Sequence, residues 1–560
     1  MSLTKRDAVV IIAAYAIVGL LFLSPSYIRP DSVGVMSWLR SAAVDRDFLF
    51  FNEWDGFGMV GEGFAWFKEV TPVGALANHW WVGSSLLTAP FWGMSHLVSL
   101  ALPGAAFPDD GFFGLDLATL GWTSVLFGAL AALAAALIVR EADPDARGRD
   151  LTFALVSTSL GTPMFWYVYR TPIGTHAAGM MIVGALAWLC WRIVSRDDDV
   201  SPLLLGLVFG IATVTRLQHV LLFPAMLFAL VKSQRPARFH ALVAAGAALP
   251  LAVQAAAWHA IYGTPLGPLA SGANLEGVTW LPFRTVHLLP VLLSPWHGLF
   301  TWSPIVLLAL GGWALLYRAG SARRDLAIVF ALMFAGELLA NAAFDRYWWG
   351  GMSFGARRFV DLAAPFAVGI AVTLRSRGRV AAMMFTIAAS AWSVALMVAA
   401  TAGSLPLGRF VTFGDLGIAV TTIPNALSAS QLRSPIGSGA LAAQSLLAIA
   451  LTCAIVGGAR VATRHRPAAP TIALGALCAV ALVTALLLIG PTRERAAEER
   501  ARHGLDGEAA RSAGALFDQR GLLEHEATWL RSRGDLDRLE ATTHEIDAIT
   551  TRLRELGVER

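Results

Sequence analysis

The chain has 560 residues, of which 56% are hydrophobic and only 15% charged, and its mean hydropathy is +0.59. Soluble domains carry about 25% charged residues, so this composition disfavours a water-soluble globule. Residues 491–560 hold 12 basic and 15 acidic side chains, a much higher density than in residues 1–490. We therefore expect residues 1–490 to form one transmembrane domain and residues 491–560 a helical region outside the membrane. The net charge of +4 lies scattered between apolar runs and gives no reason to expect nucleic-acid binding.

Apolar runs close to the length needed to cross about 30 Å of hydrocarbon recur along the chain. They predict an all-α polytopic membrane protein with about 13 transmembrane helices. The expected spans are 8–24, 117–139, 151–169, 177–194, 202–215, 219–231, 239–261, 299–317, 326–342, 358–374, 380–402, 440–458 and 471–490. The first has no small-residue cleavage site after it, which indicates a retained anchor. The short pair 202–215 and 219–231 is interpreted as a hairpin with Arg216 at its tip.

Short loops rich in arginine and lysine indicate the orientation, because such loops stay in the cytoplasm. They are 140–149, 191–199, 232–238, 317–324, 375–379 and 460–466. With 13 spans they all fall on the side of the N-terminus, so the first loop and the C-terminus face outward from the cytoplasmic (inner) membrane. This count requires that residues 81–102 do not cross. We interpret them as a juxtamembrane or re-entrant helix broken by Pro90 and His96.

The first outer loop, residues 25–116, is expected to contain juxtamembrane helices and is unusually acidic. Its acids between residues 25 and 80 are Asp31, Asp45, Asp47, Glu53, Asp55, Glu62 and Glu69. Apolar residues at helical spacing (Val33, Met36, Leu39, Ala43 and Val44) predict an amphipathic helix with Asp31 at its N-terminal end. Two plainer roles stay open: a helix N-cap for Asp31, and a solvated turn for Asp45 and Asp47.

The other outer loops are basic and aromatic, which is uncommon on that side of a membrane. Their polar residues are Arg170, His176, Arg216, His219, His297, Arg346, Arg357 and Arg358. Each loop alone is compatible with ordinary interfacial anchoring. Together they favour an anionic ligand such as a lipid phosphate. A carboxylate beside such a cluster suggests glycosyl transfer from a polyprenyl phosphate, in which the acid deprotonates an acceptor hydroxyl and the arginines stabilise the leaving phosphate.

Six segments carry a family resemblance by their order and placement within residues 8–375. They are RPDSVGVMSWLRSAAVDRDFLFFNEW, NHWWVGSSLLTAPF, GTPMFWYVYRTPIGTHA, GLVFGIATVTRLQHVLLFP, LLSPWHGLFTWSPIVLLALGG and YWWGGMSFGARRFVDLAAPF. The chain resembles a bacterial branch of the GT-C integral-membrane glycosyltransferases, the class that includes protein O-mannosyltransferases and lipid A aminoarabinose transferases. The resemblance implies a GT-C fold, with Asp31 as catalytic base and Asp47 as the later aspartate of the loop.

The chain also departs from this family in two places. Ser32 follows Asp31 where a second carboxylate is usual, so whether a divalent metal binds stays open, and no other cofactor is expected. Asn78 and His79 stand where a lysine is usual, so the phosphate contact is assigned to His79, Arg170 or Arg216. The complete set of expected donor-phosphate contacts is Arg170, Arg216, His219, Arg346, Arg357, Arg358 and His79, and further candidates are Asp45, Glu53, His176 and His297.

The expected function is transfer of a sugar from a polyprenyl-phosphate donor to an envelope glycan, lipid or protein. One alternative is a lipid-linked sugar transporter or flippase, although no internal repeat is visible. Another is an O-antigen-ligase-like enzyme, although its late loop would be more basic than residues 403–439. In the tail, Leu539, Ile546, Ile549 and Leu553 form an apolar stripe. This stripe predicts packing against a second tail helix near residues 516–530 or against the outer loops, where the tail would shape acceptor access. A solvated hairpin with no further role is the alternative.

Overall fold

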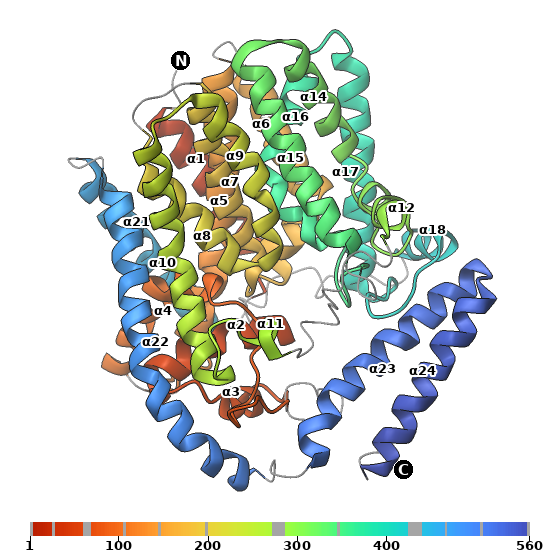
Figure 1. Cartoon of the computed structure of the whole chain (residues 1–560). Coiled ribbons are helices and arrows are strands. Elements are labelled where there is room, and N and C mark those ends of the chain that lie inside the picture. Colours follow the sequence, from red (N-terminus) through yellow and green to blue (C-terminus); the bar gives the residue numbers. More distant parts are fainter. Residues whose placement is uncertain are drawn as a thin grey trace.

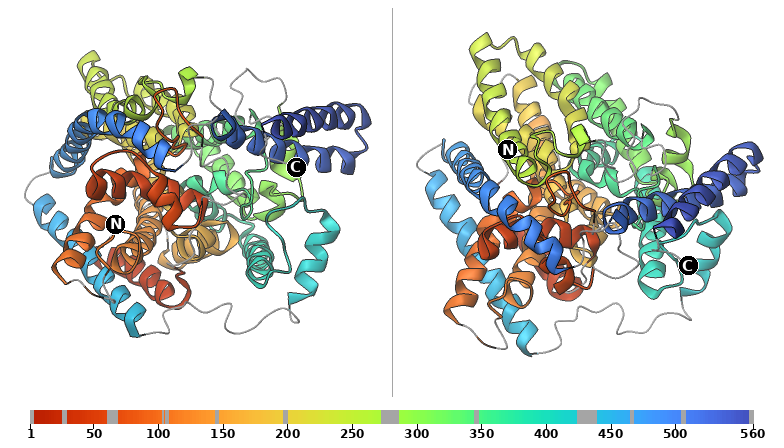
Figure 2. Two further views of the ribbon diagram at one scale, coloured as in Figure 1. Left: turned by 90° about the horizontal axis from the view of Figure 1, so that it is seen from below. Right: turned by 60° about the horizontal axis from the view of Figure 1, so that its bottom comes forward.

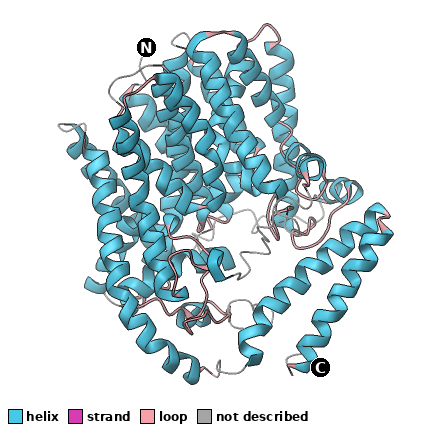
Figure 3. Ribbon diagram, in the orientation of Figure 1, coloured by secondary structure: helices cyan, strands magenta, loops and turns pink. Residues whose placement is uncertain are grey.

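The computed structural model shows an all-helical chain, and no strand occurs in the part of the chain that it describes (Figure 3). The described residues are 4–24, 29–59, 69–102, 104, 108–143, 147–195, 200–271, 286–343, 348–423, 439–464, 468–503 and 508–556. Long helices run side by side as a bundle, and the N-terminus lies at one end (Figure 1). Short helices of the first loop lie at the opposite end, on the side of the C-terminus.

Six of the described helices are long and apolar enough to cross a membrane. They are α5 (Leu115–Ala142), α7 (Thr175–Val194), α10 (Ala237–Tyr262), α15 (Ser321–Ala343), α17 (Arg379–Ala402) and α22 (Ala469–Arg502). Four shorter apolar helical segments are Pro202–Thr215, Leu217–Ser233, Val306–Arg318 and Ala442–Gly457. All of them coincide with expected spans. The chain is therefore an all-α, multi-pass membrane protein.

The remaining helical elements complete the bundle and its two ends. In the N-terminal half they are α1 (Lys5–Phe22), α2 (Pro30–Arg40), η1 (Ser41–Asp45), α3 (Phe51–Gly56), α4 (Gly83–Ala101), α6 (Gly148–Gly161), η3 (Trp166–Arg170), α8 (Pro202–Thr215), η4 (Leu217–Leu222) and α9 (Phe223–Ser233). In the C-terminal half they are α11 (Pro268–Ser271), α12 (Leu288–Leu293), α13 (Leu299–Trp302), α14 (Val306–Arg318), η5 (Arg357–Leu362), α16 (Ala363–Thr373), α18 (Phe413–Thr421), α21 (Gly439–Arg464), α23 (Glu508–Arg533) and α24 (Leu536–Glu555).

Four expected spans are not single helices, and a proline lies near each interruption. In 219–231, the 3-10 helix η4 precedes α9, whose first turn contains Pro224. In 151–169, α6 ends at Gly161 before Pro163, and the π-helix η3 follows. In 299–317, α13 ends before Pro304 and α14 begins after it. In 358–374, the 3-10 helix η5 precedes α16, whose first turn contains Pro365. Proline lacks an N–H and restricts the residue before it, so a helix readily ends or changes its geometry there.

The expected break within residues 81–102 is wrong, because α4 is one helix from Gly83 to Ala101 with Pro90 in its interior. His96 does not interrupt it either. The His96 Nδ1 lies 2.9 Å from a carboxylate oxygen of Asp116 on α5, which gives the imidazole a polar partner inside the protein. A proline inside a helix removes one backbone hydrogen bond, and α4 continues through Pro90 while it packs along α5.

The helix predicted after Asp31 is present as α2, and η1 continues it as a π-helix. It is less amphipathic than expected. Residues 32–38 are all buried, while Ala43, assigned to the apolar face, is exposed. Two serine hydroxyls fix α2 in place: Ser32 donates to the carbonyl of Ile173, and Ser85 of α4 donates to the carbonyl of Val35. The α2 helix is thus held within the protein and does not lie flat on a lipid surface.

The charged tail is helical, as predicted, but the boundary at residue 490 lies inside α22, which continues to Arg502 with Pro491 in its interior. Helices α23 and α24 then pair as a hairpin that projects beyond the bundle (Figure 2). Its core contains Leu523, Ile549 and Leu553, with Leu516 and Ile546 at the edge. Packing of the stripe against a second tail helix is therefore confirmed for Ile546, Ile549 and Leu553, whereas Leu539 packs against the main core of the protein.

Candidate functional site

Asp31 lies in the first turn of α2, but it is not the helix N-cap, since Arg29 occupies that position. Its two carboxylate oxygens have different partners. Oδ1 accepts a hydrogen bond from the Trp80 indole at 3.1 Å, and Oδ2 accepts one from the Arg357 guanidinium at 2.7 Å. The Asp31 side chain remains 41% exposed, whereas that of Arg357 is 11% exposed. Trp80 and Arg357 thus fix the orientation of the carboxylate, and part of it stays accessible to a ligand.

The Trp80 ring can approach Asp31 because it packs directly against the backbone of α2 at Gly34, which has no side chain. A Cβ atom on Gly34 would lie 1.8 Å from the nearest atom of the Trp80 ring, so only glycine permits this approach. The Asn78 side chain supports the arrangement by donating to the carbonyl of Gly34 and accepting from the backbone N–H of Trp80. Asn78 therefore helps to place the indole and does not contact the carboxylate itself.

Arg357 comes from the distant segment at the start of η5, which is anchored by Tyr167 of η3. The Tyr167 hydroxyl accepts from the N–H of Phe354 at 3.1 Å and donates to its carbonyl at 3.3 Å. Trp166 stacks on the Phe354 ring, with centroids 4.9 Å apart. This clamp lies three residues before Arg357 and holds it against α2.

The charge of Arg357 also determines the protonation of Asp31. Burial alone would raise the pKa of this carboxyl group, but Arg357, the Trp80 hydrogen bond and the nearby charge of Arg216 together lower it below its ordinary value. Asp31 is therefore ionised at neutral pH. Removal of Arg357 from this contact would raise its pKa and make it a stronger base.

A second group of charged side chains lies where the helical backbone is interrupted between α8 and η4. Arg216 has an extended backbone at this break, and its guanidinium donates to His176 at 3.1 Å and to Asp361 at 2.8 Å. His219 places Nε2 2.9 Å from the same Asp361 oxygen and Nδ1 2.8 Å from the carbonyl oxygen of Ala212. Both ring nitrogens of His219 thus face oxygen acceptors, an arrangement that suits the doubly protonated imidazolium.

Asp361 and Glu337 are the residues that the sequence analysis missed. Both are fully buried, and Glu337 accepts a hydrogen bond from Gln218 at 2.5 Å. Gly179 of α7 makes room for Asp361, since a Cβ there would lie 2.5 Å from Oδ1. The available signal was the presence of carboxylates inside the expected spans 326–342 and 358–374, because buried ionisable groups in membranes are costly and usually functional.

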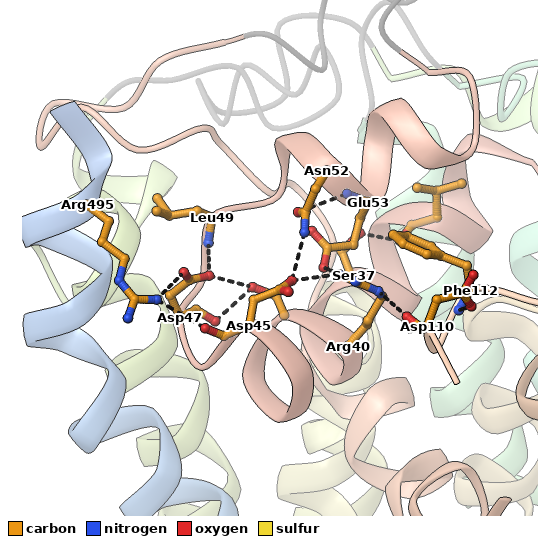
Figure 4. Close-up of polar contacts among 12 residues, drawn as sticks. Ser37, Arg40, Asp45, Asp47, Leu49, Asn52, Glu53, Asp110, Phe112 and Arg495 are labelled. Atoms are coloured by element: carbon orange, nitrogen blue, oxygen red, sulfur yellow. Dashed lines mark hydrogen bonds and ion pairs between the residues drawn. The ribbon is translucent and has the colours of Figure 1, made fainter. Parts of the chain in front are cut away.

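Three other acids of the first loop, Asp45, Asp47 and Glu53, form a separate network (Figure 4). Arg40 donates to Asp45 at 2.6 Å and to Glu53 at 2.8 Å. Asp47 accepts from Arg495 of α22 at 3.1 Å. From Asp31 to Asp45 the chain follows α2 and η1, a path of roughly 20 Å at about 1.5 Å per residue. Asp47 therefore does not share a site with Asp31, and it is not in a solvated turn but buried.

The remaining predicted residues lie in several places. His79 pairs with Glu69 at 3.1 Å, and Arg170 donates to the Ser24 hydroxyl at 3.0 Å, so neither is part of the Asp31 contacts. Arg358 and His297 are buried and line one small cavity with Arg357. Arg346 lies outside the described residues. Within the described part of the chain, no three His, Cys, Asp or Glu side chains are grouped to hold a metal ion.

Comparison with known proteins assigns no family to this arrangement. No family model matches the chain, and no match was found among curated proteins or among solved structures.

Proposed function

We propose that this chain is a GT-C-type glycosyltransferase that moves a sugar from a polyprenyl phosphate to an envelope glycan, lipid or protein at the outer face of the cytoplasmic membrane. The proposal keeps the 13-span topology, with the first loop and the C-terminus outside. The observation that carries it is the half-open carboxylate of Asp31, paired with Arg357 next to the buried arginine and histidine group of Arg216.

In this proposal Asp31 is the general base. One carboxylate oxygen accepts the proton of the acceptor hydroxyl while the hydroxyl oxygen attacks the anomeric carbon of the sugar. The bond between that carbon and the phosphate oxygen breaks, and the polyprenyl phosphate leaves with the electron pair. Arginine is suited to stabilise this anion because its guanidinium can donate two parallel hydrogen bonds to phosphate.

Arg357 couples donor binding to the strength of the base. Its contact with Asp31 offsets the effect of burial and lowers the pKa of that carboxyl group. When the donor phosphate takes over the guanidinium, the carboxylate loses this stabilisation and becomes more basic. The base is then activated only when the leaving group is in place. Arg216, held by Asp361 and His176, provides the second positive charge without having to reorganise.

The experiment is an assay of detergent-purified protein with radiolabelled short polyprenyl phosphates that carry glucose, mannose, galactose or arabinose. Transfer to water or to an extracted envelope acceptor should release polyprenyl phosphate from at least one donor. Asp31→Asn is the matched inactive variant, because it keeps the size of the side chain and removes the base. Release that is equal in both proteins, or absent from wild type with every donor, would contradict the proposal.

One observation favours a second candidate, a transporter of lipid-linked sugars. Arg216, His219, Asp361 and Glu337 form a charged group between α7, α15, η4 and η5, and such buried groups also occur on transport pathways. Proteoliposomes with the same donors separate the two functions. A transporter would move the intact donor across the bilayer without breaking the sugar–phosphate bond.

A further inference from the structure

His297 lies in the turn between α12 and α13, has an uncommon backbone conformation, and packs its ring against Trp302, with centroids 5.0 Å apart. Its φ of +62° is in the left-handed region, which is uncommon for residues other than glycine, although asparagine, aspartate and histidine adopt it more often than the rest. The residue is 3% exposed. Backbone strain at a buried polar residue often accompanies a constraint on where its side chain points.

The protonation of the His297 ring follows from its contacts. Nδ1 lies 3.0 Å from the carbonyl oxygen of Trp349, so Nδ1 carries the hydrogen and donates it. Burial, with the charge of Arg357, lowers the pKa of His297 to about 4 against the opposing effect of the Trp349 bond. At neutral pH Nε2 therefore has a lone pair. In the described part of the chain this buried atom has no hydrogen-bond partner.

His297 lines a cavity of about 10 Å³, roughly the space that one water-sized group occupies. Its polar lining also includes Asn341, Arg357 and Arg358, and Trp348 and Trp349 supply aromatic walls. Nε2 can only accept a hydrogen bond, so a group that pairs with it must donate one. A hydroxyl group or a water molecule can do this, whereas an ionised phosphate oxygen cannot.

We propose that His297 determines sugar specificity by accepting a hydrogen bond from one hydroxyl of the transferred sugar. This inference rests on the proposed glycosyl transfer. It adds a recognition position to that site, because Arg357 lines the cavity and also contacts Asp31. Arg357 would then adjoin both the sugar hydroxyl in the cavity and the catalytic carboxylate.

Two variants of His297 distinguish loss of the hydrogen-bond acceptor at Nε2 from a general disturbance of the fold. His297→Asn tolerates the left-handed backbone, keeps an N–H near the position of Nδ1 for the Trp349 carbonyl, and removes the acceptor at Nε2. His297→Gln can return a carbonyl oxygen to the position of Nε2. His287→Gln is the matched control, since His287 is also buried and stacks on Trp348, with centroids 5.6 Å apart, but does not line the cavity.

The measurement is equilibrium binding of the four labelled donors described above, followed by analogues of the tightest donor that each lack one hydroxyl. We expect His297→Asn to weaken binding of that donor about tenfold, with partial recovery in His297→Gln and little change in His287→Gln. For one deoxy analogue, wild type and His297→Asn should bind equally, because the contact is already absent.

The outcomes distinguish this inference from the function on which it rests. If wild type neither binds nor cleaves any donor, both proposals fail. If wild type is active but His297→Asn binds the parent donor as tightly as wild type, only the hydroxyl site is overturned. The same conclusion holds if the variant loses an equal factor with every deoxy analogue, since His297 then contacts no particular hydroxyl.

Discussion

The first loop carries two groups of acids whose surroundings differ in one decisive way. Asp31 shares its carboxylate with Trp80 and Arg357 and keeps 41% of its side chain exposed. Glu53 is paired with Arg40 and is 1% exposed. Both are ion pairs with arginine, but only the first leaves a face open to a ligand. An acid cluster in a sequence therefore says little about chemistry until the exposure of each carboxylate is known.

Of the changes that test this difference between the two groups of acids, substitution of Asp31 should have the largest effect on turnover. Asp31→Asn should lower turnover by about 100-fold or more, since general-base catalysis contributes at least that factor. Asp47→Asn should change turnover by less than about threefold, because Asp47 pairs with the half-exposed Arg495 of α22 and lies in the other network. Rates of donor cleavage in the two variants check this. Equal losses in both would mean that the two networks act as one site.

A somewhat smaller effect is expected from the deep charge group. Arg216→Ala should raise the donor KM or lower kcat by about tenfold to a hundredfold, which corresponds to about 1.5–3 kcal/mol for one charge-assisted contact. Gly179→Ala offers a subtler test, since its methyl group would displace Asp361 and, through it, Arg216. Donor binding and turnover should fall in both. Unchanged values in both would show that the group is purely structural.

Removal of the tail should have the next largest effect on activity. A chain ending at His503 keeps the contacts of Arg495 and Arg500 with the first loop but loses the α23–α24 hairpin. We expect donor hydrolysis to survive and transfer to the native acceptor to fall several-fold. A chain ending at Gly490 is the comparison, because it also loses those arginines and should unfold at lower temperature. Loss of hydrolysis in the longer of the two truncated chains would place the tail within the catalytic site itself.

The smallest effect concerns pH and the Glu53 network. Burial, together with the charge of Asp45, raises the pKa of Glu53 well above its ordinary value despite Arg40. A carboxyl group with a raised folded-state pKa stabilises the fold at low pH, and this contribution is lost as the pH rises. Glu53→Gln has no such loss. Its Tm should therefore rise relative to wild type between about pH 5 and pH 8, by about 1–3 °C. A difference in Tm between the two proteins that does not change with pH would contradict the raised pKa of Glu53.

Periodicity predicted the long helices well because their apolar stretches are uninterrupted, as in α5 and α7. It did not predict the interruptions near Pro163, Pro304 and Pro365, since hydropathy averages over a window and ignores the backbone. Asp31 and Arg357 were predicted individually as site residues. Their direct contact was not, because 326 residues separate them and only the fold brings them together.

Asp361 and Glu337 were missed for a related reason. Each lies in an otherwise apolar run, where a single acid barely lowers the mean hydropathy of the window. Their roles depend on Arg216 and His219, which come from another part of the chain. The ion pairs of Asp45 with Arg40 and of Asp47 with Arg495 could not be predicted either, because pattern and spacing do not show which arginine the fold brings to each acid.

The helix α22 links the lipid phase to the first loop in a single element. Its 34 residues extend over roughly 50 Å at about 1.5 Å per residue. One part is apolar enough to remain in hydrocarbon, while Arg493, Arg495 and Arg500 attach the other to His259, Asp47 and Gly74. We therefore expect membrane thickness to set the height at which the acidic loop is held. Stretching or thinning the bilayer should shift that height and with it the reaction rate, which reconstitution into short-chain and long-chain phosphatidylcholine would reveal.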